Sequence, residues 1–108
     1  MPNVPQALLA TLLLLVAPGA LAENDAPPPG NPERGAELAP LCTSCHGREG
    51  RSNISRYPSI AGMAPALFRE RMEALQAGDG GHLLKRMTQD LSDRDIADLA
   101  AHFAILGE

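Results

Sequence analysis

Apolar residues recur at helical spacing in the last part of the chain. One stripe is formed by Ile96, Leu99, Ala100, Phe103 and Leu106. Ser92 occupies an N-cap position, and Asp95 three residues later gives a carboxylate variant of the capping box. This pattern predicts an amphipathic helix that begins after Ser92 and buries the stripe.

A second amphipathic segment begins at Pro65, which suits a first helical turn, and is closed by Gly78. Its expected buried face consists of Leu67, Phe68, Met72 and Leu75. Its expected solvent-facing side consists of Arg69, Glu70, Arg71 and Glu73.

A third helix is expected from Asn31 to about Leu41. Asn31 is a good N-cap and Pro32 suits the first helical position. Gly35 is a poor helix former, so its place inside this helix indicates that another backbone comes close there.

Two segments, residues 47–62 and 78–90, are expected to be loops. The first is rich in Gly, Ser, Asn and Pro, and a loop of this length in a small domain usually wraps around something. No segment alternates polar and apolar residues as a strand does, so the sequence predicts an all-α domain.

The first 22 residues predict an export signal. Residues 8–16 form a short apolar core, and Ala20-Leu21-Ala22 has the small-x-small pattern preferred at cleavage sites. Because no Lys or Arg precedes the core, an uncleaved anchor remains an alternative. The division is therefore a signal at 1–22, a Pro-rich leader at 23–30 and one domain at 31–108.

Removal of 22 of the 108 residues leaves 86, with only Tyr57, Phe68 and Phe103 as aromatics. So small a domain buries little apolar surface, so an inserted cofactor is expected to complete its core and the cofactor-free chain to fold poorly. The net charge is −4, which makes nucleic acid an unsuitable partner.

The candidate chemistry lies in Cys42-Thr43-Ser44-Cys45-His46. C-x-x-C-H is the attachment motif of a c-type haem, in which two thiols add to the vinyl groups and the imidazole binds the iron. A zinc site and a thioredoxin-like redox pair are the alternatives. For zinc, only His46, His82 and His102 remain as ligands besides the cysteines, and they lack the usual paired spacing. A thioredoxin-like pair would be expected near a βαβ pattern, which is not found beside this motif.

Together these residues resemble the class I cytochrome c family, and especially the single domains of di-haem periplasmic cytochromes. The likeness extends from Gly35 through 42–47 and 57–62 to the segment 91–101. It implies an all-α class I cytochrome c fold, with three to four helices around one haem c held covalently by Cys42 and Cys45. It also implies that the first and last helices cross at Gly35 and Leu99, with His102 at a position usually held by an aromatic residue.

The resemblance further implies two roles around the iron, beyond His46 as proximal ligand. The Pro58 carbonyl would accept a hydrogen bond from His46, which fixes the imidazole tautomer. The family methionine ligand stands seven residues before Leu91, where this chain has Leu84. Met87 through a shifted loop is the preferred distal ligand, while His82 or no strong protein ligand remain alternatives.

The predicted function is that of a periplasmic, single-haem electron carrier between redox partner proteins. No catalytic side chain, nucleic acid or stable membrane insertion after signal cleavage is expected. Two alternatives stay open: a haem subunit of a larger periplasmic oxidoreductase, and an open-coordination haem protein that binds small ligands.

Overall fold

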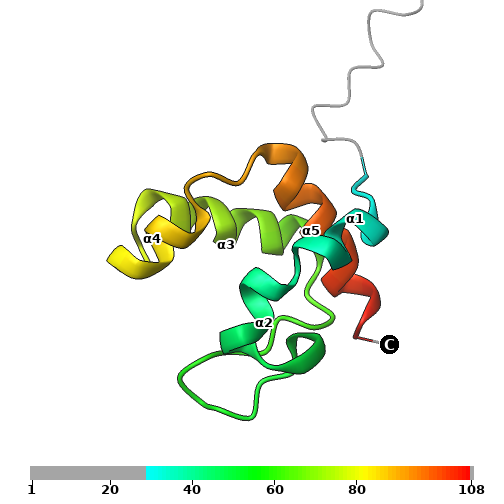
Figure 1. The fold of residues 1–108 in the computed structure, drawn as a ribbon, viewed down its shortest axis with the longest axis horizontal. Coiled ribbons are helices and arrows are strands. Elements are labelled where there is room, and N and C mark those ends of the chain that lie inside the picture. Colours follow the sequence, from blue (N-terminus) through cyan, green and yellow to red (C-terminus); the bar gives the residue numbers. More distant parts are fainter. Residues whose placement is uncertain (1–28, 108) are drawn as a thin grey trace, which may run out of the picture.

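The computed structural model describes residues 29–107 (Figure 1). The predicted signal and most of the Pro-rich leader lie outside these residues. The helices are α1 Pro32–Leu38, α2 Pro40–His46, the 3₁₀ helix η2 Arg48–Gly50, α3 Pro65–Ala77, α4 His82–Thr88 and α5 Asp93–Ile105. The described part contains no strand, and the all-α prediction is confirmed.

The first predicted helix is divided in two. Pro40 has no amide hydrogen and its ring excludes continuation of the preceding helix, so α1 ends at Leu38 and Pro40 begins α2. The predicted continuous helix to about Leu41 is therefore wrong. The C-x-x-C-H motif therefore lies on a helix of its own, α2.

The predicted end of α3 at Gly78 and the predicted start of α5 after Ser92 are both confirmed. Gly78 adopts a left-handed conformation with φ of 105°, and its N–H bonds to the carbonyls of Ala74 and Leu75. At α5 the Ser92 hydroxyl accepts from the Asp95 N–H at 3.0 Å, and the Asp95 carboxylate accepts from the Ser92 N–H at 2.9 Å. The side chain of Leu67, predicted to be buried, is 38% exposed.

The predicted loop at 78–90 is wrong, because it contains α4. Gly81, with φ of 95°, turns the chain into this helix, and the Leu, Lys, Arg and Met residues that follow are good helix formers. Gln76 on α3 fixes the far end of α4 by donating to the carbonyls of Thr88 and Leu91 at 2.9 and 3.0 Å. With this helix and the divided first one, the described part has five α-helices rather than three to four.

The centre of the core lies on α5. Ile96, Leu99 and Phe103 have at most 1% of their surface exposed, and the Phe103 ring stacks on Phe68 of α3 with centroids 5.8 Å apart. Figure 1 shows α1 lying across α5 on the other side. None of the helices within 29–107 has the length and hydropathy to cross a bilayer.

The predicted close approach at Gly35 is confirmed. A Cβ built on Gly35 would overlap the carbonyl oxygen of Asp98 and lie 2.8 Å from Cβ of His102. His102 itself packs edge-on against Phe103, with ring centroids 4.9 Å apart. The absent side chain at Gly35 is what lets the α1 and α5 backbones meet.

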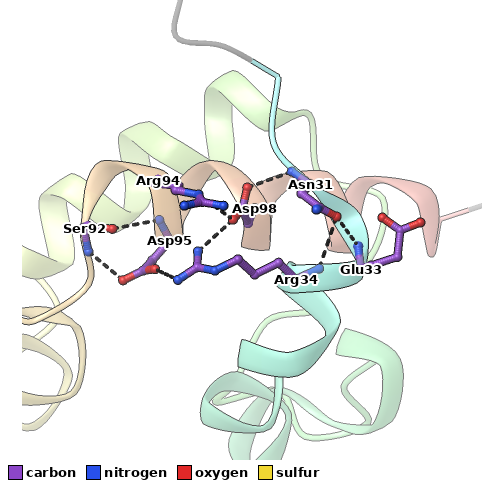
Figure 2. A network of polar contacts seen from close by, with 7 residues as sticks. All are labelled: Asn31, Glu33, Arg34, Ser92, Arg94, Asp95 and Asp98. Atoms are coloured by element: carbon purple, nitrogen blue, oxygen red, sulfur yellow. Dashed lines mark hydrogen bonds and ion pairs between the residues drawn. The ribbon is translucent and has the colours of Figure 1, made fainter.

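A polar network beside this crossing joins the same two helices (Figure 2). The Arg34 guanidinium donates to Asp95 at 2.6 Å and to Asp98 at 2.7 Å. The Asn31 N–H donates to the other oxygen of Asp98 at 2.7 Å, while the Asn31 side chain caps α1. The network thus fixes the start of α1 on the face of α5.

Replacement of Gly35 by alanine is expected to separate α1 from α5. Overpacking of a tight contact costs about 1–3 kcal/mol of unfolding free energy, which urea denaturation followed by circular dichroism measures. Ala36→Ser, on the exposed side of the same helix, is the control and should cost about 0.5 kcal/mol. Equal losses in the two variants would show that the crossing is not tight.

Candidate functional site

A cavity of about 350 Å³ is lined by α2, the loop at 47–62, α3 and α4. From α2 come Leu41, Cys42, Cys45 and His46, from the loop Pro58 and Ile60, and from the residue after the loop Met63. The other wall includes Phe68, Arg71, Met72 and Leu75 of α3, with Leu84, Met87 and Thr88 of α4. Most of the lining is apolar, as is usual for cofactor sites of this size.

The two cysteines lie one turn apart on α2, so both line the same cavity. Both are free thiols, and burial raises the pKa of the Cys42 thiol to about 11. Thioredoxin-type chemistry uses the free thiolate, which a raised pKa disfavours at neutral pH. An apolar partner for the sulfur atoms, such as a vinyl group, suits this environment better.

His46, the last residue of α2, is held by the Pro58 carbonyl, which lies 2.7 Å from Nδ1. Because a carbonyl oxygen only accepts, Nδ1 carries the proton and the lone pair is on Nε2. This is the tautomer that binds a metal through Nε2, with an oriented ring and an increased basicity. The Tyr57 ring packs edge-on at 6.3 Å between centroids.

The loop that carries Pro58 is itself fixed in place. The Gly50 carbonyl accepts from the N–H groups of Ile60 and Ala61 at 2.8 and 3.1 Å. The Ser59 hydroxyl accepts from the Ser52 N–H at 2.9 Å. These bonds join residues that follow Pro58 to residues that precede it, and they hold the Pro58 carbonyl toward His46.

The wall formed by α4 contributes Leu84 and Met87 to the cavity. His82, at the start of α4, is exposed and is not among the lining residues. Met72, predicted from the sequence only to pack on the buried face of α3, also lines the cavity, and so does Met63. Three methionines therefore line one cavity, and the one on α4 is Met87, the predicted distal ligand.

Arg71 differs from the sequence-based expectation. It is exposed, as expected for the solvent-facing side of α3, yet it also lines the cavity. Helical spacing places Arg71 beside Phe68 and Leu75. A long side chain on the border of an apolar face can extend toward the cavity or toward solvent.

The five predicted site residues all line this one cavity: Cys42, Cys45, His46, Pro58 and Met87. An apolar cavity, a pair of thiols on one turn and an imidazole with a free Nε2 form the donor set that fits haem c. His102 lies outside the lining and packs at the α1–α5 crossing.

Comparison with known proteins identifies relatives of this site and fold. No protein-family model matches the chain. Cytochrome c4 of Pseudomonas aeruginosa is 34% identical over 100 residues, which cover 90% of this chain and 47% of that protein. Cytochrome c4 of Azotobacter vinelandii is 32% identical over 105 residues, which cover 88% of this chain and 48% of that protein.

The chain spans about half the length of these cytochromes c4. Cytochrome c-554(548) of Halomonas halodenitrificans is matched almost in full: it is 33% identical over 79 residues, which cover 69% of this chain and 95% of that protein. The resemblance to a cytochrome c domain is confirmed. The chain belongs to the class I cytochrome c family.

Proposed function

We propose that this chain is a single-haem c-type cytochrome that transfers one electron at a time between redox partner proteins. The observation that carries the proposal is the His46–Pro58 hydrogen bond of 2.7 Å, which leaves Nε2 available in the cavity that also receives both cysteines. A chain of this family with that arrangement needs no catalytic side chain.

In this proposal Cys42 and Cys45 hold the haem through thioether bonds and His46 is the proximal ligand. When bound, haem c supplies an iron that alternates between the ferrous and ferric states. Pro58 keeps the imidazole ring in one orientation and one tautomer in both states. The apolar side chains of α3 and α4 exclude water, which limits reorganisation of the surroundings when the charge changes.

The same proposal assigns Met87 as the distal ligand. Its support is that Met87 lines the cavity from α4, whereas Leu84 has no donor atom and His82 is exposed outside the lining. A His/Met pair raises the haem potential, which suits a carrier. Leu84 in the same wall favours a second candidate, a haem open on this side that binds small ligands.

The proposed setting is the periplasm, with residues 1–22 as the signal. Covalent haem is installed outside the cytoplasm, where a closely spaced thiol pair would otherwise oxidise. The proposed donors and acceptors are proteins that meet the chain transiently through small interfaces.

Replacement of Met87 by alanine tests the ligand assignment. The ferric wild type is expected to show the weak long-wavelength band of methionine-to-iron ligation, and the variant to lose it and become high-spin. Absorption spectroscopy of the holoprotein measures both the loss of the band and the change of spin state. The midpoint potential of the variant is expected to be lower than that of the wild type.

Met63→Ala and Met72→Ala are the matched controls, because both thioethers line the same cavity. Loss of the band in one of these controls rather than in Met87→Ala would reassign the ligand. A high-spin wild type that no substitution changes would instead establish the open-coordination alternative.

A further inference from the structure

Helix α4 forms the wall of the cavity that carries the predicted distal ligand, yet little of this helix is buried. Thr88 is buried, Leu84 and Met87 are half-buried, and the other side chains of α4 are exposed. A helix of seven residues has too few internal hydrogen bonds to be stable in water by itself. The position of this wall therefore depends on the contacts that α4 makes with the rest of the domain.

The Gln76 side chain on α3 supplies the hydrogen bonds that hold the end of α4. Its Nε2 group donates to the Thr88 carbonyl at 2.9 Å and to the Leu91 carbonyl at 3.0 Å. Within residues 29–107, no other hydrogen bond or ion pair joins α4 to another helix. Apolar packing accompanies these bonds, since the side chains of Leu75 on α3 and Leu84 on α4 both lie against Gly80.

The carbonyls that Gln76 holds belong to the segment around the distal residues. Thr88 follows Met87 directly, and its hydroxyl donates to the Leu84 carbonyl at 2.8 Å. The Leu91 N–H donates to the Thr88 carbonyl at 3.0 Å, which closes the turn after α4. Because Gln76 fixes both ends of this turn, it fixes the backbone that presents Leu84 and Met87 to the cavity.

Loss of the Gln76 donor would leave this segment short of hydrogen bonds. Among the described residues, the Leu91 carbonyl accepts from no other group, and Thr88 is only 5% exposed. A carbonyl that loses its partner in such a place is costly until water reaches it. Water gains access when the end of α4 moves away from α3, so removal of Gln76 makes this outward movement easier.

We propose that Gln76 is a positioning residue of the haem site, which holds α4 over the iron face away from His46 and thereby limits the access of external ligands to that face. The inference rests on the proposed haem-binding function. With Met87 as distal ligand, an external ligand binds only while α4 is displaced, so its association rate follows the fraction of chains in which α4 has moved. With no protein ligand on that face, the same movement uncovers the iron.

The test compares the rates at which imidazole binds to the ferric holoproteins, measured by stopped-flow absorption at pH 8, where imidazole is mostly neutral. Leucine suits a helix as well as glutamine but donates no hydrogen bond, so Gln76→Leu should bind imidazole about tenfold faster than the wild type. Gln76→Glu keeps the size of the side chain and offers no donor at pH 8, so it should change the rate in the same direction. Gln76→Lys keeps donors for both carbonyls and should stay within about twofold of the wild type.

Two controls separate positioning from loss of stability and from added charge. Asp98→Asn weakens the network between α1 and α5, which includes no residue of α4. Ala77→Lys adds a positive charge at the exposed residue next to Gln76. Both variants should bind imidazole within about twofold of the wild-type rate.

A Gln76→Leu rate equal to that of the wild type or of Asp98→Asn would overturn the inference and leave the electron-carrier proposal intact. A Gln76→Lys rate as high as that of Gln76→Leu would also overturn it. A wild type without the methionine-to-iron band would overturn the Met87 assignment, while the imidazole rates would still measure access past α4. A wild-type chain without covalent haem, detected by haem staining of the denatured protein, would overturn both proposals.

Discussion

Replacement of both Cys42 and Cys45 by serine is expected to abolish covalent haem and to leave the chain largely unfolded. Serine hydroxyls do not form thioether bonds with the vinyl groups, so no haem should remain after denaturation. Haem staining and mass determination of the denatured protein measure the first effect. Circular dichroism and urea denaturation measure the second.

The folding effect follows from how the core and the cavity share side chains. Ile60, Phe68 and Met72 belong to the buried core and also line the cavity. These side chains are 3–8% exposed in the structure, and the face that a haem would cover borders an apolar cavity of about 350 Å³. Loss of the haem therefore removes the packing partner of this face of the core, and a small domain has little stability to spare.

Ser44→Ala is the control for the cysteine variants, since it changes the same pentad without removing a thiol. It should keep one haem for each chain and the wild-type helical signal. Each single cysteine variant should retain one thioether bond at most. Covalent haem in the double variant would mean that the attachment site lies elsewhere.

The cap positions of α3 and α5 were predictable because their signals are local. Gly78 and the Ser92–Asp95 capping box act within one turn, and the structure has them where the sequence indicates. The break at Pro40 also had a local signal, because proline disfavours a helix interior, but the predicted helix was extended past it to about Leu41. Helix α4 has only seven residues, too few for an apolar period to be read.

The candidate site was predictable in its chemistry and less so in its walls. The motif identified Cys42, Cys45 and His46 by spacing, while the role of Pro58 came from the family resemblance and agrees with the 2.7 Å contact. Arg71 and Met63 reach the cavity through the path of the chain around it. A helical wheel shows which face a residue occupies, but not how far a long side chain extends from its border.

The Asp98 network makes the stability of the fold depend on pH. Two hydrogen bonds lower the pKa of Asp98 below its ordinary 3.8: the larger effect comes from the Asn31 N–H and the smaller from the Arg34 guanidinium. The Ser92 N–H, followed by Arg34, does the same for the pKa of Asp95. Because both folded-state values are lowered, their stabilisation is complete above pH 3.8 and is lost as the pH falls through the lower folded-state values.

Asp98→Asn is expected to lower the melting temperature of the holoprotein by roughly 10 °C near neutral pH. The asparagine oxygen replaces only one acceptor, and its amide would place donors against the Arg34 guanidinium. Calorimetry at a series of pH values should show the difference from wild type narrowing as the pH falls from 3.8 through the lowered folded-state pKa, since the unfolded chain then binds a proton more readily than the folded Asp98 carboxylate. Asp93→Asn removes the same charge from the exposed first turn of α5 and should cost less at every pH. A constant difference between Asp98→Asn and wild type down to about pH 2 would show that the Asp98 charge does not join α1 to α5.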